Sequence, residues 1–95
     1  MSAPDPLLTG LGEAIRDLRD EQGVSQERLG LDSGVHRNYI GGIERAERRP
    51  TLATVATLAT TLGIRPSELI ARAETQAEQH GASWPPCLSP NGERS

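Results

Sequence analysis

The chain has 95 residues and a net charge of −3, and its aromatic residues are one Tyr and one Trp, with no Phe. A single domain of this size has little room for an enzyme cleft. No apolar run approaches the roughly 20 residues that a membrane-spanning helix needs, and the N-terminus lacks the charged and then apolar order of a signal peptide. We therefore expect a cytoplasmic protein whose core is built from Leu, Ile, Val and Ala side chains.

Five helices are predicted from apolar residues at helical spacing and from start and stop signals around them. Gly23 and Gly63 each follow an apolar stripe and are typical helix ends. Ser25 and Thr51 are good N-caps, and Pro66 suits the first position of a helix. The predicted helices cover approximately residues 8–21, 25–32, 36–45, 51–62 and 66–80.

One domain with two flexible ends follows from these helices. They fall within residues 7–80, whereas residues 1–6 precede the first apolar stripe. Residues 81–95 hold prolines that cannot continue a helix, so we expect a flexible tail there.

The order of the helices is typical of DNA-binding proteins. Two short helices joined by a turn at Ser33-Gly34 form the arrangement in which a helix projects into the major groove. The characteristic segments are Ile15-Arg16-Asp17-Leu18-Arg19, Gly23-Val24-Ser25-Gln26-Glu27, Leu29, Ser33-Gly34-Val35, Tyr39-Ile40, Ile43-Glu44-Arg45, Arg49-Pro50-Thr51-Leu52 and Leu58-Ala59-Thr60-Thr61-Leu62-Gly63-Ile64. With all of them in register, the stretch 11–69 resembles the Cro and phage-repressor family. This resemblance implies an all-α, five-helix, lambda-repressor-like fold with the helix-turn-helix at the second and third helices.

The resemblance also implies a function. Proteins of this family are transcriptional regulators that bind operator sites on double-stranded DNA as homodimers, and RNA polymerase is a further partner to consider. Residues 37–45 are most similar to the controller proteins of restriction-modification systems. An antitoxin-like autoregulator is the alternative, with residues 74–95 folding onto a protein toxin; Trp84 among prolines motivates it.

An enzyme, a metal site and a cofactor are not expected. Cys87 is the only cysteine, so it has no disulfide partner within the chain and no second Cys at metal-site spacing. His36 and His80 show no arrangement that would activate Cys87 as a nucleophile.

Base contacts are expected at the start of the third helix, because the N-terminal residues of that helix face base edges in a helix-turn-helix. Arg37 can donate two bonds to guanine O6 and N7, and Asn38 can pair with adenine N6 and N7. The Tyr39 ring can contact a thymine methyl group. The alternative is that all three belong to a solvated first turn.

Phosphate contacts are expected on both sides of these residues. Every basic residue is Arg, and residues 34–50 hold four Arg against two Glu, whereas residues 1–23 hold two Arg against five acidic residues. The basic charge is therefore local, at the third helix and the loop after it. In the family register, Gln26 matches a phosphate-binding position, while His36 can be a contact or a simple N-cap. The expected phosphate contacts are Gln26, His36, Arg45, Arg48 and Arg49.

Glycines interrupt the two short helices, and each costs roughly 0.8–1 kcal/mol relative to Ala. Gly30 falls where the family packs a small residue between the two helices, and Gly41 and Gly42 are expected to approach the DNA. Ala46 stands where Gly commonly ends the third helix.

Two further expectations concern structure. The family carries an ion pair that fastens the first helix to the third, and it corresponds here to Arg19 and Glu44. Apolar residues of the last two helices exceed what so small a domain can hide, so we expect a twofold dimer interface there. Its expected residues are Leu52, Leu69 and Ile70.

Overall fold

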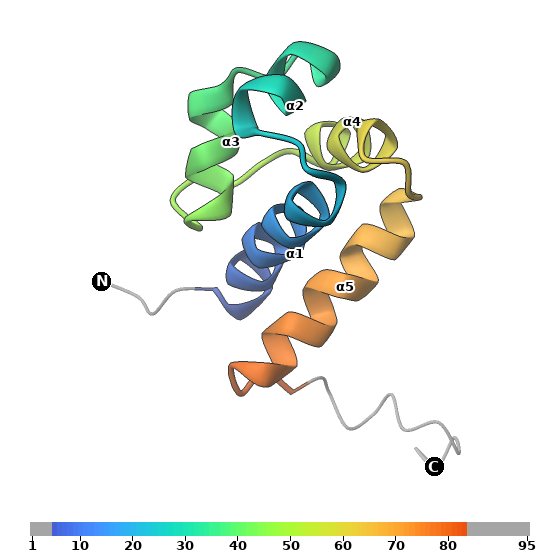
Figure 1. Cartoon of the computed structure of the whole chain (residues 1–95). Coiled ribbons are helices and arrows are strands. Elements are labelled where there is room, and N and C mark those ends of the chain that lie inside the picture. The colour runs from blue at the N-terminus through green and yellow to red at the C-terminus, as the bar shows by residue number, and fades with distance from the viewer. Residues whose placement is uncertain (1–4, 84–95) are drawn as a thin grey trace.

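The computed structural model describes residues 5–83, and these residues form five helices and no strand (Figure 1). The predicted all-α fold is therefore confirmed. The segment that follows, with Trp84 and Cys87, lies outside the described residues, as do residues 1–4. The helices are α1 (Pro6–Gln22), α2 (Gln26–Ser33), α3 (Arg37–Glu44), α4 (Leu52–Thr61) and α5 (Pro66–Gln79).

The first helix begins earlier than the apolar pattern predicts. Asp5 is its N-cap and accepts hydrogen bonds from the backbone N–H groups of Leu7, at 2.8 Å, and Leu8. Pro6 occupies the first turn, where its missing N–H is no loss. The expectation that residues up to 6 are flexible is wrong for Asp5 and Pro6, which cap and begin the helix.

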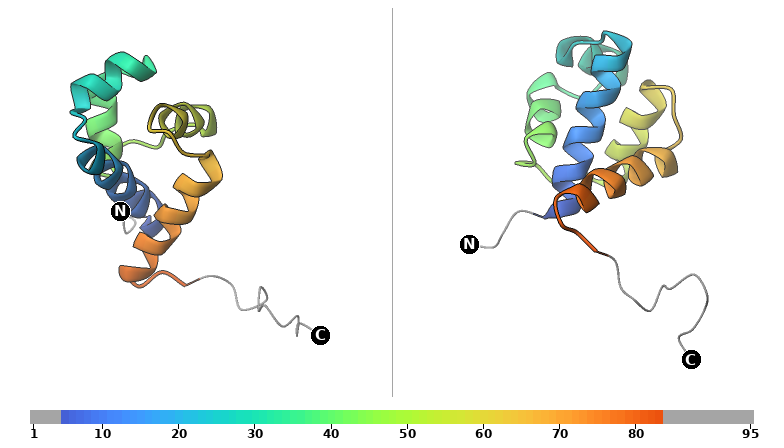
Figure 2. Two further views of the ribbon diagram at one scale, coloured as in Figure 1. Left: turned by 45° about the vertical axis from the view of Figure 1, so that its right-hand side comes forward. Right: turned by 60° about the horizontal axis from the view of Figure 1, so that its bottom comes forward.

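The central helix is α1, which lies between α3 and α5 and contributes one face to the core (Figure 2). Its inner face contributes Leu11, Ile15 and Leu18, all nearly or fully buried. Aliphatic side chains of the other four helices complete a single cluster, as the composition predicts. No helix in the described part of the chain is long and apolar enough to cross a membrane.

Two glycines let α1 approach its neighbours closely, and the sequence analysis did not single them out. A Cβ atom on Gly10 would overlap the backbone carbonyl of Ala73 in α5. A Cβ atom on Gly12 would lie 2.5 Å from the carbonyl oxygen of Ile43 in α3. Backbone atoms cannot turn aside as a side chain can, so both crossings require glycine.

Candidate nucleic-acid interface

The two short helices α2 and α3 meet at a tight turn. Gly34 adopts φ 78°, a left-handed conformation that glycine reaches without strain, and its N–H donates to the carbonyl of Gly30. A Cβ atom on Gly30 would lie 2.7 Å from the carbonyl oxygen of Val35. The structure confirms that a small residue is needed between these helices, which fixes the angle at which α3 is presented.

The start of α3 exposes the predicted base-contacting side chains. Arg37 and Asn38 are exposed, and Tyr39 is half-buried against the core. His36 caps the helix, because its Nδ1 accepts a hydrogen bond of 3.0 Å from the N–H of Asn38. His36 is thus the N-cap, the second of the two roles that the sequence left open, and only its Nε2 is left for a phosphate.

Glu44 lies at the centre of a buried polar cluster that joins three helices. Arg19 donates to both of its carboxylate oxygens, from Nε at 2.6 Å and from Nη2 at 2.9 Å. The carboxylate is 1% exposed and the Arg19 side chain 11%, so the predicted ion pair is present and nearly dry. Hydrogen bonding to Glu44 raises the pKa of Arg19, although burial acts in the opposite direction.

Gln26 is held by the same carboxylate. Its side-chain nitrogen donates to Glu44 Oε1 at 2.9 Å, which the sequence analysis did not foresee. An amide nitrogen has two N–H donors, so one stays available for a phosphate at the start of α2. Arg16 approaches the same oxygen at 3.9 Å but is half exposed.

The arginines after α3 differ in how they are held. Arg45 pairs with Glu47 at 3.2 Å. The guanidinium of Arg48 lies 5.8 Å from the centroid of the Tyr39 ring, a cation–π contact. Arg49 is exposed, and its carbonyl accepts a long, 3.5 Å bond from the Tyr39 hydroxyl. Both Arg48 and Arg49 therefore contact Tyr39 of α3.

The glycines of α3 do not face open solvent, which corrects their expected approach to DNA. A Cβ atom on Gly42 would lie 2.5 Å from Cγ of Arg48, and one on Gly41 would lie 3.1 Å from Nη1 of Arg45. Both glycines are buried. Gly42 leaves room for the stem of Arg48, and Gly41 leaves room for the end of the Arg45 side chain and for the amide of Gln26. Ala46 follows with φ 60°, the conformation for which glycine is the usual choice.

The three residues expected in the dimer interface lie in different environments. Leu52, at the start of α4, is 77% exposed, and Ile70 is half-buried against the core. Leu69 is 0% exposed, so its place in the interface was predicted wrongly. The helical period identifies an apolar face, but here the chain's own core already covers Leu69.

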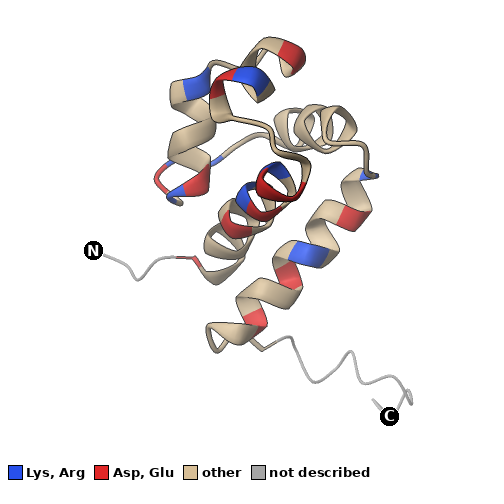
Figure 3. Cartoon of the chain, viewed as in Figure 1, with Lys and Arg blue, Asp and Glu red and all other residues tan. Residues whose placement is uncertain are grey.

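Figure 3 shows basic residues at the start of α3 and, beside two glutamates, where that helix ends. The charged residues within α5 are three Glu and one Arg. No group of acidic, Cys or His residues in the range 5–83 could hold a metal ion. A tight two-helix unit, an exposed polar start of α3 and flanking arginines define a helix-turn-helix DNA-binding protein.

The chain belongs to the helix-turn-helix family, whose model matches residues 15–69. It is accordingly a DNA-binding transcriptional regulator and not an enzyme. The control protein C.SmaI of Serratia marcescens is 42% identical over 69 residues, which are 73% of this chain and 82% of that protein.

Solved structures give the same assignment. The restriction-modification controller protein C.AhdI of Aeromonas hydrophila superposes with a TM-score of 0.63 at 45% identity, covering 65% of this chain and 90% of that one. The C.Esp1396I controller tetramer, in complex with its natural 35 base-pair operator, matches with a TM-score of 0.69 at 28% identity. That match covers 76% of this chain and 95% of the controller.

Proposed function

We propose that this protein is a restriction-modification controller that binds its operator as a homodimer and sets the transcription of the neighbouring genes. The observation that carries the proposal is the 42% identity to C.SmaI over 82% of that protein. The structure of the C.Esp1396I tetramer on its operator supports the mode of binding. Because DNA is the proposed ligand, the protein would act in the bacterial cytoplasm.

In the proposed complex, α3 enters the major groove and its first residues meet the bases. Arg37 and Asn38 are exposed there, and Tyr39 beside them is partly exposed. Gln26 and the free N–H groups at the start of α2 would hold one phosphate. Arg48 and Arg49, on the other side of α3, would hold the backbone of the same groove.

The proposed dimer uses the exposed start of α4, at Leu52, and the part of α5 around Ile70. Leu52 is one of two large apolar side chains that are strongly exposed in the described part of the chain. Pairing these surfaces about a twofold axis would place two α3 helices about 34 Å apart, the distance between successive major grooves. Ile70, half-buried in one subunit, would be covered by the other.

In vitro selection from a pool of randomised 30 base-pair duplexes tests this proposal. The expected product is a twofold-symmetric sequence whose half-sites lie about one helical turn apart. A match to that sequence upstream of the gene itself would identify the operator. A transcription assay with RNA polymerase on that DNA then shows whether the protein activates or represses. Failure to enrich any sequence would contradict the proposal.

The genomic neighbourhood separates the controller from the antitoxin. A methyltransferase or endonuclease gene beside this one is the expected finding. A short toxin-like reading frame would instead favour the antitoxin-like role and a protein partner for the C-terminal residues.

A further inference from the structure

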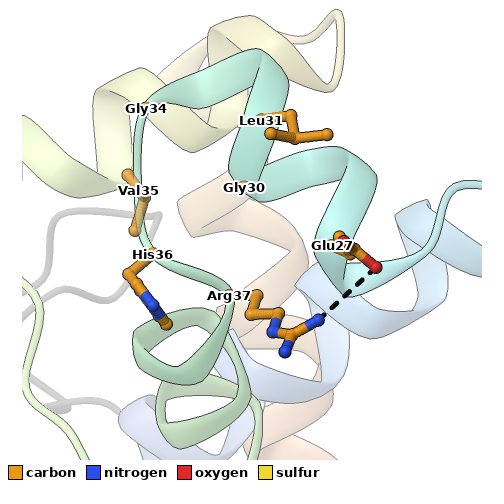
Figure 4. A pocket seen from close by; sticks show the side chains of 7 residues that line it. All are labelled: Glu27, Gly30, Leu31, Gly34, Val35, His36 and Arg37. Carbon is orange, nitrogen blue, oxygen red and sulfur yellow. Dashed lines mark ion pairs between the residues drawn. The ribbon is translucent and has the colours of Figure 1, made fainter.

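An ion pair joins the start of α2 to the start of α3, directly beside the proposed base contacts. Oε1 of Glu27 lies 3.4 Å from Nη1 of Arg37. Figure 4 shows both side chains at the pocket between the two helices, with Arg37 pointing toward Glu27. The side chains are 66% and 57% exposed, so a duplex that reaches Arg37 also comes close to the carboxylate of Glu27.

The pair uses only part of the guanidinium. When Nη1 faces Glu27, the edge formed by Nε and Nη2 is left to donate two parallel bonds. Arg19 shows what this edge can do, since it uses Nε and Nη2 to bind both oxygens of Glu44. On Arg37 the same edge fits O6 and N7 of a guanine. Glu27 therefore limits the rotation of the Arg37 side chain without occupying the donors that a base needs.

The negative charge has a second effect. Random DNA offers Arg37 mainly phosphates, and Glu27 both competes for the guanidinium and repels those phosphates. A correctly placed guanine supplies two directed bonds and is less affected by this competition. An acidic side chain among the DNA-facing residues thus weakens binding to wrong sequences more than binding to the right one.

We propose that Glu27 is a positioning residue that sets sequence discrimination through Arg37. It holds the guanidinium by Nη1, keeps the Nε and Nη2 edge free for guanine, and reduces capture of Arg37 by phosphates of unrelated DNA. This inference rests on the proposed DNA-binding function. It makes discrimination a property of an α2–α3 pair rather than of α3 alone.

The test compares E27Q with wild type on two probes, the duplex enriched by in vitro selection and a shuffled duplex of the same length. E27Q keeps the size of the side chain and removes its charge. We expect the affinity for the shuffled duplex to rise about two- to fivefold, the range of an exposed ion pair. The ratio of the affinity for the selected duplex to the affinity for the shuffled duplex should fall, because lost repulsion favours both complexes whereas lost positioning of Arg37 weakens only the complex with the selected duplex. The salt dependence on the shuffled duplex should steepen.

E21Q is the matched control. Glu21 forms an exposed pair with Arg72, at 3.5 Å and on the α1–α5 side of the molecule, so E21Q makes the same change in net charge away from α3. Its affinity ratio should equal that of wild type. In an R37A background, E27Q should no longer change the ratio, because the residue through which it acts is gone.

The outcomes separate the two hypotheses. If wild type enriches no sequence from the pool, the proposed function itself fails. If wild type discriminates between the duplexes but E27Q, like E21Q, leaves the ratio of the two affinities unchanged, the function stands and the role of Glu27 is overturned. Unchanged thermal unfolding of E27Q, expected for an exposed side chain, shows that a shift in ratio does not come from misfolding.

Discussion

Arg19 and Glu44 are 25 residues apart in the chain, yet their side chains form a two-bond ion pair that leaves the carboxylate only 1% exposed. The pair fastens α1 to the end of α3, and Gln26 extends it to α2. One carboxylate therefore helps to fix the position of α3 relative to α1 and α2. Because Glu44 raises the pKa of Arg19 above its already high ordinary value, the guanidinium stays charged at every pH used for binding assays.

Replacing Arg19 by Met should lower the free energy of unfolding by about 3 kcal/mol, because Glu44 is left buried without its cation. Thermal or urea unfolding followed by circular dichroism measures this decrease. R28M is the control: it removes the exposed Arg28–Asp32 pair, whose side chains are 65% and 44% exposed. That change should stay within about 0.5 kcal/mol. Equal decreases in the two variants would show that Glu44 is better solvated than the structure indicates.

Replacing Gly12 by Ala should destabilise the protein by about 1–3 kcal/mol, even though Ala favours helices. The new methyl group would meet the carbonyl oxygens of Ile43 and Glu44, at 2.5 and 2.6 Å, so α1 and α3 must separate. G41A is the matched control, since its methyl group meets the movable end of the Arg45 side chain, with Nη1 at 3.1 Å, instead of backbone. It should unfold close to wild type in the same denaturation experiment, and a G12A protein as stable as G41A would refute the close crossing.

Replacing Arg37 by Ala and replacing Arg48 by Ala should weaken DNA binding in different ways. R37A should weaken binding to the selected operator by about 1–3 kcal/mol and binding to shuffled DNA little, because a bidentate guanine contact discriminates between bases. R48A should weaken both complexes alike and flatten the plot of log affinity against log salt by about 0.9, because one phosphate fewer is neutralised. Fluorescence anisotropy at several salt concentrations measures both. A uniform decrease in R37A would make Arg37 a phosphate contact instead.

Replacing Leu52 by Glu should weaken self-association and, through it, operator binding. The buried Leu69 is unsuited to this test, because a carboxylate at a position that is 0% exposed would unfold the subunit. L31E is the control: Leu31 is 72% exposed, close to the 77% of Leu52, but lies on α2. Sedimentation should show a shifted dimer equilibrium in L52E only. Wild type that stays monomeric at tens of micromolar and on DNA would contradict the twofold arrangement.

The helices could be predicted from the sequence because each carries local signals: N-caps at Ser25 and Thr51 and terminal glycines at Gly23 and Gly34. The start of α1 was misplaced because apolar spacing was given more weight than Asp5, which caps the helix before its first apolar residue. The exposed start of α3 was likewise predictable from local sequence.

Tertiary contacts could not be predicted where the family resemblance implied no counterpart, as it did for the Arg19–Glu44 pair. Leu69 belongs to the same apolar stripe whether the chain's own core or a second subunit covers it. The close crossing at Gly10 depends on where α5 runs. The stacking of Arg48 on Tyr39 joins a loop to a helix, and no periodic pattern connects such residues.

The two glycines of α1 affect how well the proposed dimer can tolerate a change in the distance between the two operator half-sites. Gly10 contacts α5 and Gly12 contacts α3. Residues two positions apart in an α-helix are separated by about 200° of rotation about its axis, so these contacts lie on opposite sides of α1. Both are contacts between backbones, which have no rotamers with which to adjust. In the proposed dimer, the subunit interface and the DNA-facing helix are therefore linked through a stiff rod. If the DNA between the two half-sites is lengthened by one base pair, the DNA must deform, because the protein cannot. Flexible sequences between the half-sites would therefore tolerate the insertion better than rigid ones.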